Sequence, residues 1–302
     1  MRRLTRSRLT PLALLVLAGS LTLTACGGAD ATTAGDATTG GATGTLRISG
    51  STTVNPVAAD AAEALRSTDL TITVDTQGGS AGGITQLAAG QIDIAMSSKP
   101  IADADRTAAP DVDFTETRIG EDAVGIVVRK EVLAGGLKSL TKQQLKQLFE
   151  GEVANWKQLG GPDLDVFVYD KEPGRGTREV LDRFLYGKGV KAPAPPNNPR
   201  YAIVGGNEET RTKLLSTPGS VAPLSSGFVA DQPELGLLAV EGITPTAATI
   251  ADGSYPLSRP LFLVTDGAPQ GAAKTFIDYV LSPEGQPLLT RHGYLTNAQL
   301  KA

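Results

Sequence analysis

The chain has 302 residues, 40% of them hydrophobic and 20% charged, which is enough to bury one large core or two moderate ones. Its formal net charge is −4, and without the four arginines near its start it keeps 24 basic and 32 acidic side chains, so no basic block favours nucleic-acid binding. With one cysteine and one histidine, the usual metal clusters of these residues are excluded, and no spaced aspartate loop suggests calcium. We therefore expect no metal, no cofactor and no nucleic-acid partner.

The first segment of the chain predicts export and a lipid anchor. Four arginines precede an apolar stretch from Pro11 to Leu23, which is short for a bilayer span but long enough for a signal-peptide core. It closes on Leu23-Thr24-Ala25-Cys26, which resembles the lipobox of bacterial lipoproteins. No second cysteine is available to pair with Cys26. We predict a signal peptide over residues 1 to 25, and a lipid anchor at Cys26 with a flexible tether over residues 26 to 44. Residues 27 to 44 contain no apolar residue larger than Ala.

Strands and helices alternate after the tether. Short apolar runs that end in glycine or polar turns predict strands over residues 46 to 50, 70 to 74 and 92 to 96. Apolar residues at helical spacing predict helices over residues 57 to 65 and 84 to 89. This alternation indicates a parallel sheet of the α/β class.

The second half of the chain continues the pattern. Strands are predicted over residues 123 to 128 and 166 to 169, and a third over 255 to 264 is expected to be broken by Pro256 and Pro260. Helices are predicted over residues 141 to 149, 180 to 185 and 272 to 281, the first with Thr141 and Gln144 as a capping box. Residues 191 to 200 contain four prolines and are predicted to form an extended surface loop.

Three turns rich in glycine, serine and threonine each follow a predicted strand and open a predicted helix. They lie at residues 50 to 53, 78 to 83 and 174 to 177. Helix N-termini present unpaired N–H groups and partial positive charge, so three that converge would cradle an anion. Glycine allows close approach of the backbone, and hydroxyls add donors. A single such turn is no more than a helix cap, but the three together predict a small anionic ligand.

Four motifs in order give the chain a family resemblance. They run from Ile48 to Thr53, Gln77 to Ile84, Ile92 to Pro100 and Tyr255 to Pro260. With them, residues 45 to 296 resemble the phosphate-binding lipoproteins that serve bacterial ABC transporters, within the type 2 periplasmic-binding-protein fold. The resemblance implies two α/β lobes joined by strands that cross near residues 122 to 127 and 254 to 262, with ligand clamped by hinge closure. Lobe 1 would comprise residues 45 to 124 and 258 to 302, and lobe 2 residues 125 to 257.

The resemblance also implies which residues bind the ligand. Thr52 would give its hydroxyl, Thr53 its backbone N–H, and Ser80 both kinds of group. Ser98 stands where the best-studied branch of the family has an aspartate that accepts the proton of phosphate, and a hydroxyl can donate as well as accept. The full implied set is Thr52, Thr53, Ser80, Ser98, Lys171, Arg175, Gly176 and Thr177.

The second-lobe motif departs from the family pattern Arg-x-x-Gly-Ser-Gly-Thr. Lys171 stands at the first position and would act as a point charge without the bidentate fork of arginine. Arg175 replaces the serine. Its side chain either borders the ligand or points to solvent and pairs with Glu172 or Glu179.

The function that the resemblance implies is capture of inorganic phosphate and its delivery to an ABC transporter permease. The protein would be a lipid-anchored monomer at the outer face of the cytoplasmic membrane or in the periplasm. Two alternatives remain open: a binding protein for sulfate, molybdate or an organic phosphate, and a lipid-anchored sensor or interaction protein without transport. We expect no enzymatic activity. Gly78 to Gly82 fits a nucleophile elbow at Ser80, with His292 downstream, but only about 35 folded residues precede Ser80, too few for a hydrolase sheet.

Overall fold

Strands and helices alternate along residues 44 to 66 and 69 to 300, which are the residues that the structure, a computed structural model, describes. The predicted signal peptide, Cys26 and the tether up to residue 43 lie outside them. The strands are β1 (Gly44–Gly50), β2 (Leu70–Val74), β3 (Ile94–Ser97), β4 (Phe114–Arg129), β5 (Ser139–Leu140), β6 (Phe167–Lys171), β7 (Tyr201–Val204), β8 (Ser220–Ser225), β9 (Leu235–Val240), β10 (Ser258–Asp266) and β11 (Leu295–Thr296). The α-helices are α1 (Asn55–Ala64), α2 (Gly79–Ala88), α3 (Asp103–Ala108), α4 (Lys130–Ala134), α5 (Lys142–Phe149), α6 (Gly176–Tyr186), α7 (Asn207–Ser216), α8 (Ala247–Ala251), α9 (Gly271–Leu281) and α10 (Gln286–Arg291).

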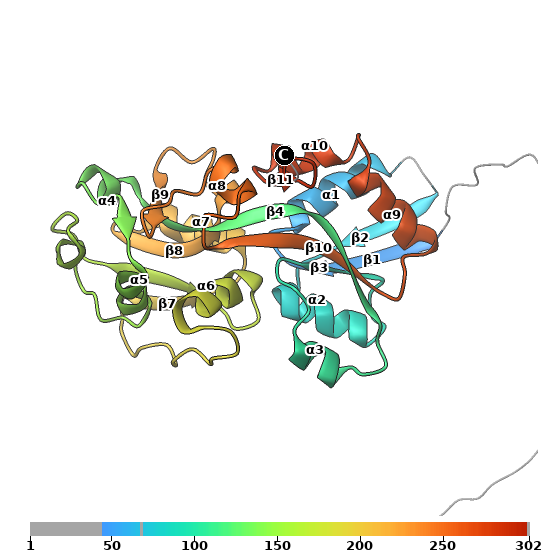
Figure 1. Ribbon diagram of the computed structural model, residues 1–302, viewed down its shortest axis with the longest axis horizontal. Coiled ribbons are helices and arrows are strands. Elements are labelled where there is room, and N and C mark those ends of the chain that lie inside the picture. The colour runs from blue at the N-terminus through green and yellow to red at the C-terminus, as the bar shows by residue number, and fades with distance from the viewer. Residues whose placement is uncertain (1–43, 67–68, 301–302) are drawn as a thin grey trace, which may run out of the picture. The chain divides into compact units, whose positions relative to one another are not determined.

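Lobe 1 is built on a sheet with helices on both faces. Strand β1 pairs in parallel with β2 and β3, as the sequence pattern predicts, and β10 adds to β3 in the antiparallel sense. Helices α1, α9 and α10 cover one face, and α2 and α3 lie on the other (Figure 1). Ile48, Val57 and Phe276 belong to the core of the first face, and Ile84 and Leu87 of α2 pack into the core of the second.

Lobe 2 repeats this layered arrangement with other strands. The C-terminal part of β4 pairs antiparallel with β8 and β9, and β6 lies parallel to β7 and β8. One core contains the apolar residues of α5 and α6, among them Leu145 and Leu181. A second core contains Leu214 of α7 and Val204 of β7. The sheet is therefore covered on both faces, as α/β proteins require.

The two long strands β4 and β10 connect the lobes. They pair antiparallel over much of their length, and both run between the lobes (Figure 1). Asp122 of β4 and Arg259 of β10 are opposite each other in this ladder. The predicted two-lobed periplasmic-binding-protein fold of the α/β class is confirmed, whereas the exact lobe boundaries remain predictions.

The structure corrects several predicted elements. Strand β10 is not broken by proline: Pro256 precedes the strand, and Pro260 lies where β4 is the only partner, because β3 pairs only with residues 262 to 264. A strand with one free side tolerates the missing N–H of proline. Helix α2 begins at Gly79 and strand β4 at Phe114, both earlier than predicted. The elements between residues 201 and 254 were not predicted at all.

Other predictions hold locally. Helix α5 has Thr141 as its N-cap, and the Thr141 hydroxyl and the Gln144 side chain form the expected capping box. Residues 191 to 200 contain no helix or strand. Within the described part of the chain, none of the helices has the length and apolar character needed to cross a membrane.

Candidate anion-binding site

A pocket lies between the lobes, where the turns before four helices meet. Its cavity volume is about 10 Å³, which is room for about one water molecule. All eight residues that the sequence singles out line it. The lining comprises Ser51, Thr52 and Thr53 before α1, Gly79 and Ser80 at the start of α2, Ser98 after β3, Lys171 at the end of β6, Arg175, Gly176 and Thr177 at the start of α6, and Gly205 and Asn207 at the start of α7.

Glycine at the end of β1 explains how the first turn enters the pocket. Gly50 has a φ of +133°, and a Cβ atom there would lie 2.4 Å from the backbone oxygen of Met96 on β3. Only glycine allows two backbones to come this close. The next N–H, of Ser51, then donates to that same oxygen at 2.9 Å. The turn is thus tied to β3, and its hydroxyls face the segment that carries Ser98.

Serine hydroxyls form a connected group in lobe 1. The Ser51 hydroxyl donates to Ser98 Oγ at 3.0 Å, and the hydroxyls of Ser80 and Ser98 lie 3.3 Å apart. The backbone N–H of Ser98 donates to Ser80 Oγ at 3.2 Å. All three residues are buried. The network therefore holds the hydroxyls of three separate segments against one cavity.

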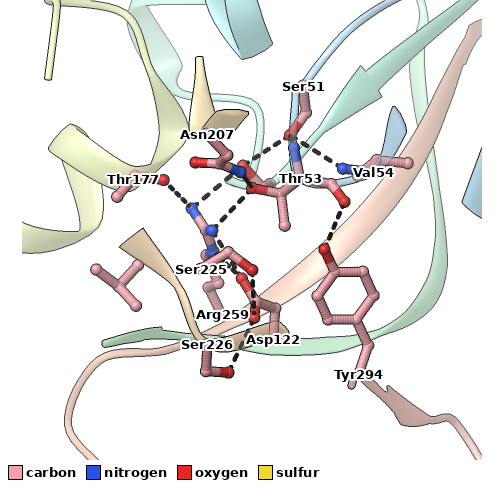
Figure 2. Close-up of polar contacts among 12 residues, drawn as sticks. Ser51, Thr53, Val54, Asp122, Thr177, Asn207, Ser225, Ser226, Arg259 and Tyr294 are labelled. Carbon is pink, nitrogen blue, oxygen red and sulfur yellow. Dashed lines mark hydrogen bonds and ion pairs between the residues drawn. The ribbon is translucent and has the colours of Figure 1, made fainter. Parts of the chain in front are cut away.

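Arg259 and Asp122 form the floor behind these hydroxyls (Figure 2). Both side chains are 0% exposed, and Nε and Nη2 of Arg259 donate to Asp122 Oδ2 at 2.9 and 2.7 Å. The other N–H groups of the guanidinium donate to Thr53 Oγ1 and Thr177 Oγ1 at 2.9 Å each and to Ser98 Oγ at 3.3 Å. Burial raises the pKa of the Asp122 carboxyl, while the hydrogen bonds from Arg259 oppose that rise.

Lys171 is the buried cation of the lining. Its ammonium donates to the backbone oxygens of Gly205 and Gly206 at 3.4 and 3.2 Å, to Asn207 Oδ1 at 3.3 Å, and to the hydroxyl of Thr210. Burial lowers the pKa of Lys171 to about 7, and the nearby arginines add to this effect. An anion in the pocket would have the opposite effect and favour the charged ammonium.

Arg175 adopts both of the arrangements that the sequence leaves open. Its guanidinium pairs with Glu172, with Nε and Nη2 at 3.0 and 2.7 Å from Oε2, and its side chain also borders the pocket. It does not use Glu179, which pairs with Lys99. A Cβ atom added to Gly79 would lie 2.7 Å from Arg175 Cδ, so the arginine reaches from lobe 2 to the start of α2 in lobe 1.

Besides Ser51 and Gly79, which lie within two of the predicted turns, three residues of the site are absent from the predicted set. Gly205 and Asn207 open helix α7 directly after the short strand β7, the same order of strand, glycine and helix as in the three predicted turns. That signal was available and overlooked. Arg259 lies inside a recognised motif, but nothing in the local sequence indicates that its charge is buried.

The lobes are closed over the pocket. The N–H of Ala81 on α2 donates to the backbone oxygen of Gly174 at 3.1 Å, and Asn207 Nδ2 donates to Thr53 Oγ1 at 3.0 Å. Both hydrogen bonds join lobe 1 to lobe 2. These bonds across the cleft explain why the cavity between the lobes is so small.

The chemistry of the lining suits an anion. Among the described residues that line the pocket, hydroxyls, glycines, an amide and two cations occur, and none carries a carboxylate. The part of the chain that the structure describes also holds no group of three or more His, Cys, Asp or Glu side chains placed to bind a metal. The arrangement can hold a small anion by hydrogen bonds and nearby positive charge.

Ser80 and His292, the two residues that a hydrolase would use, have different hydrogen-bond partners. Ser80 bonds with Ser98, whereas His292 Nε2 lies 3.0 Å from Asp60 Oδ2 on α1. No hydrogen bond between Ser80 and His292 joins them as a nucleophile and its base, within the described residues. This geometry gives the elbow motif no support as a catalytic site.

Known proteins share the sequence and the fold. The family described as PBP superfamily domain matches residues 35 to 284. The phosphate-binding protein PstS of Bacillus subtilis (strain 168) is 29% identical over 272 residues, which are 86% of this chain and 83% of that protein. A crystal structure from Clostridium perfringens, described as a phosphate ABC transporter substrate-binding protein with bound phosphate, matches with a TM-score of 0.73 and 28% identity over 84% of this chain and 99% of that one. A structure of an ABC-type phosphate transport receptor from Vibrio cholerae matches with a TM-score of 0.65 and 27% identity over 83% of this chain and 99% of that one. Because the family match covers most of its length, the chain belongs to the PBP superfamily.

Proposed function

We propose that this protein captures inorganic phosphate between its two lobes and delivers it to the permease of an ABC transporter. The observation that carries the proposal is the pocket between the lobes, whose lining combines hydroxyls and helix starts with the cations Lys171 and Arg175. The phosphate-binding relatives support the choice of anion. They do not favour the alternatives of another oxyanion or of a sensor without transport.

Local donors explain how an acidic protein can hold a dianion. Helix N-termini and hydroxyls act at hydrogen-bond distance in a dry cleft, where electrostatic interactions are strong. The acidic side chains elsewhere on the surface are screened by salt over roughly 10 Å. The eight predicted residues would therefore bind phosphate through short-range contacts, and closure of the lobes would complete them.

The close approach of the two lobes at Gly176 argues against phosphorylated organic compounds. An ester carries carbon on at least one oxygen, which a bare oxyanion does not. Gly176 approaches Ser98 so closely that a Cβ atom at position 176 would lie 2.4 Å from Ser98 Oγ. An organic substituent at this point would hold the lobes apart.

Location and partners complete the proposal. Lipidation at Cys26 would hold a monomer at the outer face of the cytoplasmic membrane, and the tether would let the closed, loaded form dock on the permease subunits. The protein would act by binding alone, without enzymatic activity. A strain that lacks the gene should lose uptake of labelled phosphate at low external concentration, and a Cys26→Ser copy should restore it incompletely.

Calorimetric titration tests the binding itself. The full chain in detergent micelles, stripped of bound anions by unfolding and refolding, would be titrated with phosphate, sulfate and molybdate. We expect tight binding of phosphate and weaker binding in Thr52→Ala and Ser80→Ala. Heat from sulfate or molybdate but none from phosphate would refute the choice of ligand, and no heat from any of them would refute the binding function.

A further inference from the structure

We infer that Arg259 is a positioning residue of the pocket: it fixes the hydroxyls of Thr53 and Ser98 as hydrogen-bond donors, so that the pocket holds phosphate as its dianion. The inference rests on the proposed function, because it concerns the form in which that ligand is bound. Arg259 itself is completely buried and is not among the residues that line the cavity. It acts through the hydroxyls in front of it.

The guanidinium of Arg259 has a fixed direction. Its two bonds to Asp122 orient it, and Asp122 is in turn held through its other oxygen, Oδ1, which accepts from the hydroxyls of Ser225 at 3.0 Å and Ser226 at 3.4 Å (Figure 2). An arginine side chain has five N–H donors. Two go to Asp122, and the other three go to hydroxyls of the pocket, so no N–H of Arg259 is left for a ligand.

Counting lone pairs then assigns the direction of two hydroxyls. A hydroxyl oxygen accepts two hydrogen bonds and donates one. Ser98 Oγ accepts from Arg259 at 3.3 Å and from Ser51 at 3.0 Å, so its own proton is left for Ser80 Oγ, 3.3 Å away, or for a ligand. Thr53 Oγ1 accepts from Arg259 at 2.9 Å and from Asn207 at 3.0 Å. Both oxygens are saturated as acceptors, so each hydroxyl can only donate.

Saturated hydroxyls discriminate between protonation states of the ligand. Each proton on a phosphate oxygen needs an acceptor, and a buried donor without one carries a desolvation cost. The monoanion brings two such protons and the dianion one. Ser98 and Thr53 accept neither, and a hydroxyl that donates to the ligand forms a stronger bond to a more negative oxygen. The pocket therefore favours the form with fewer protons.

Other charged groups around the pocket bear on the same equilibrium. Lys171 and Arg175 are in the lining, and Glu172 pairs with Arg175. Glu209 accepts from the N–H of Gly205 at 2.9 Å at the start of α7. Asp122 lies behind Arg259 and is separated from the cavity by it. Burial lowers the pKa of the Lys171 ammonium to about 7.

Lobe closure sets the donor direction. Thr53 and Ser98 belong to lobe 1, whereas Asn207, which supplies the second bond to Thr53, belongs to lobe 2. Thr177 of lobe 2 shares Nη1 of Arg259 with Ser98. In an open cleft Thr53 would regain a free lone pair. The preference for the dianion is thus a property of the closed form.

Proton release on binding tests the inference. The full chain would be titrated with inorganic phosphate at pH 5.5 in two buffers of different ionisation enthalpy, which gives the number of protons exchanged. Free phosphate is then mainly the monoanion and Lys171 is already charged, so release reports on the ligand. We expect release of about one proton per phosphate by the unaltered chain. In Arg259→Gln we expect less than half of that release and a Kd about 10- to 100-fold higher.

Conservative and remote variants separate positioning from a structural role. Arg259→Lys keeps the charge beside Asp122 but cannot reach both hydroxyls, so we expect partial recovery of affinity and continued low proton release. Arg129→Gln removes another arginine that bonds a carboxylate and a backbone oxygen away from the pocket, and both readouts should stay as in the unaltered chain. If Arg259→Gln fails to fold by circular dichroism, the Asp122→Asn/Arg259→Gln double variant, which removes both charges, replaces it.

Two results would overturn the inference while the proposed function stands. One is phosphate binding by the unaltered chain without proton release. The other is weaker binding by the Arg259 variants with release as in the unaltered chain, which would make Arg259 a structural residue only. Absence of phosphate binding by the unaltered chain would refute the proposed function, and the inference with it.

Discussion

Lys99, on the segment after β3, and Glu179, on α6, form an ion pair across the two lobes, with 3.1 Å between Nζ and Oε2. The Lys99 side chain is 7% exposed, and its ammonium also lies 3.3 Å from Asp105 Oδ2. Neither Lys99 nor Glu179 lines the phosphate pocket. The pair therefore holds the closed form without touching the ligand.

Removal of this pair should accelerate release of phosphate. In Glu179→Gln the closed form loses one partly exposed ion pair, a contribution of about 0.2 to 1 kcal/mol. We expect phosphate to dissociate about two- to fivefold faster, as measured by stopped-flow displacement. Asp163→Asn is the matched control, because it removes the pair of Lys157 and Asp163, 3.1 Å apart within lobe 2. Equal dissociation rates in Glu179→Gln and the unaltered chain would contradict the role of the pair.

Gly176→Ala should separate affinity from stability. A Cβ atom at position 176 would lie 2.4 Å from Ser98 Oγ and 3.0 Å from Ser80 Oγ, so the lobes could not close fully. We expect loss of at least about tenfold in phosphate affinity by titration calorimetry. Thermal unfolding should change little, because alanine is the better helix former at the first residue of α6.

Gly206→Ala provides a graded comparison for that variant. Its Cβ atom would lie 3.1 Å from Thr52 Cγ2, the end of a side chain that can move slightly. The loss of affinity should be smaller than for Gly176→Ala. A larger loss of affinity in Gly206→Ala than in Gly176→Ala would show that contact at Gly176 does not limit closure of the lobes.

Lys171 should make stability depend on pH. The pKa of its ammonium is about 7 in the folded protein, against an ordinary value of 10.5, so between these values the unfolded chain binds more protons. The free energy of unfolding should therefore rise with pH from about 7 to 9.5, by up to about 3 kcal/mol from this residue. Urea unfolding at pH 7 and at pH 9.5 measures this rise in the free energy of unfolding. In Lys171→Met the rise should be smaller by that amount, and an identical rise would exclude Lys171 as its source.

Saturating phosphate should weaken the same pH dependence. An anion in the pocket favours the charged ammonium and moves its pKa back toward the ordinary value. The difference in proton binding between the folded and unfolded chains then falls. Calorimetric titration with phosphate at pH 9 in two buffers of different ionisation enthalpy should show this as proton uptake on binding, and Lys171→Met should lack it.

Arg175→Ser tests the arginine that reaches between the lobes. This change removes a cation from the lining together with its contact to Gly79 and restores the serine of the family pattern. We expect a Kd about tenfold higher and a weaker dependence of affinity on salt. Arg183→Ser, at an exposed position on the same helix, should change neither. If Arg175→Ser leaves the affinity for phosphate unchanged, Arg175 forms an ion pair with Glu172 but does not contribute to ligand binding.

Local signals explain what the sequence could predict. The turns that contain Thr52, Ser80 and Thr177 were recognisable because glycine and hydroxyl residues follow a strand and open a helix, a pattern contained within a few positions. Within lobe 1 the parallel strands bring two of these turns to one edge of the sheet, and the closed lobes bring the turn of Thr177 to them. The turn at Gly205 has the same signal, but its strand is only four residues long and was missed.

Long-range pairing explains what the sequence could not show. Asp122 and Arg259 are 137 residues apart, and only the register of β4 against β10 places them opposite each other. The sequence neighbours of Asp122 and Arg259 do not distinguish these two residues from charged residues at a protein surface. The effect of Pro260 was likewise hidden, because proline disrupts a strand between two partners but not one with a free side.

The floor of the pocket is part of the connecting strands β4 and β10 and not of a separately folding lobe. A chimera of two related proteins can test this. If lobe 2 comes from a relative, the starts of its helices α6 and α7 come from that relative, whereas Arg259 and Asp122 remain those of this chain. Ligand preference would then follow the parent that supplies the two strands, even though half of the residues that line the pocket come from the other parent.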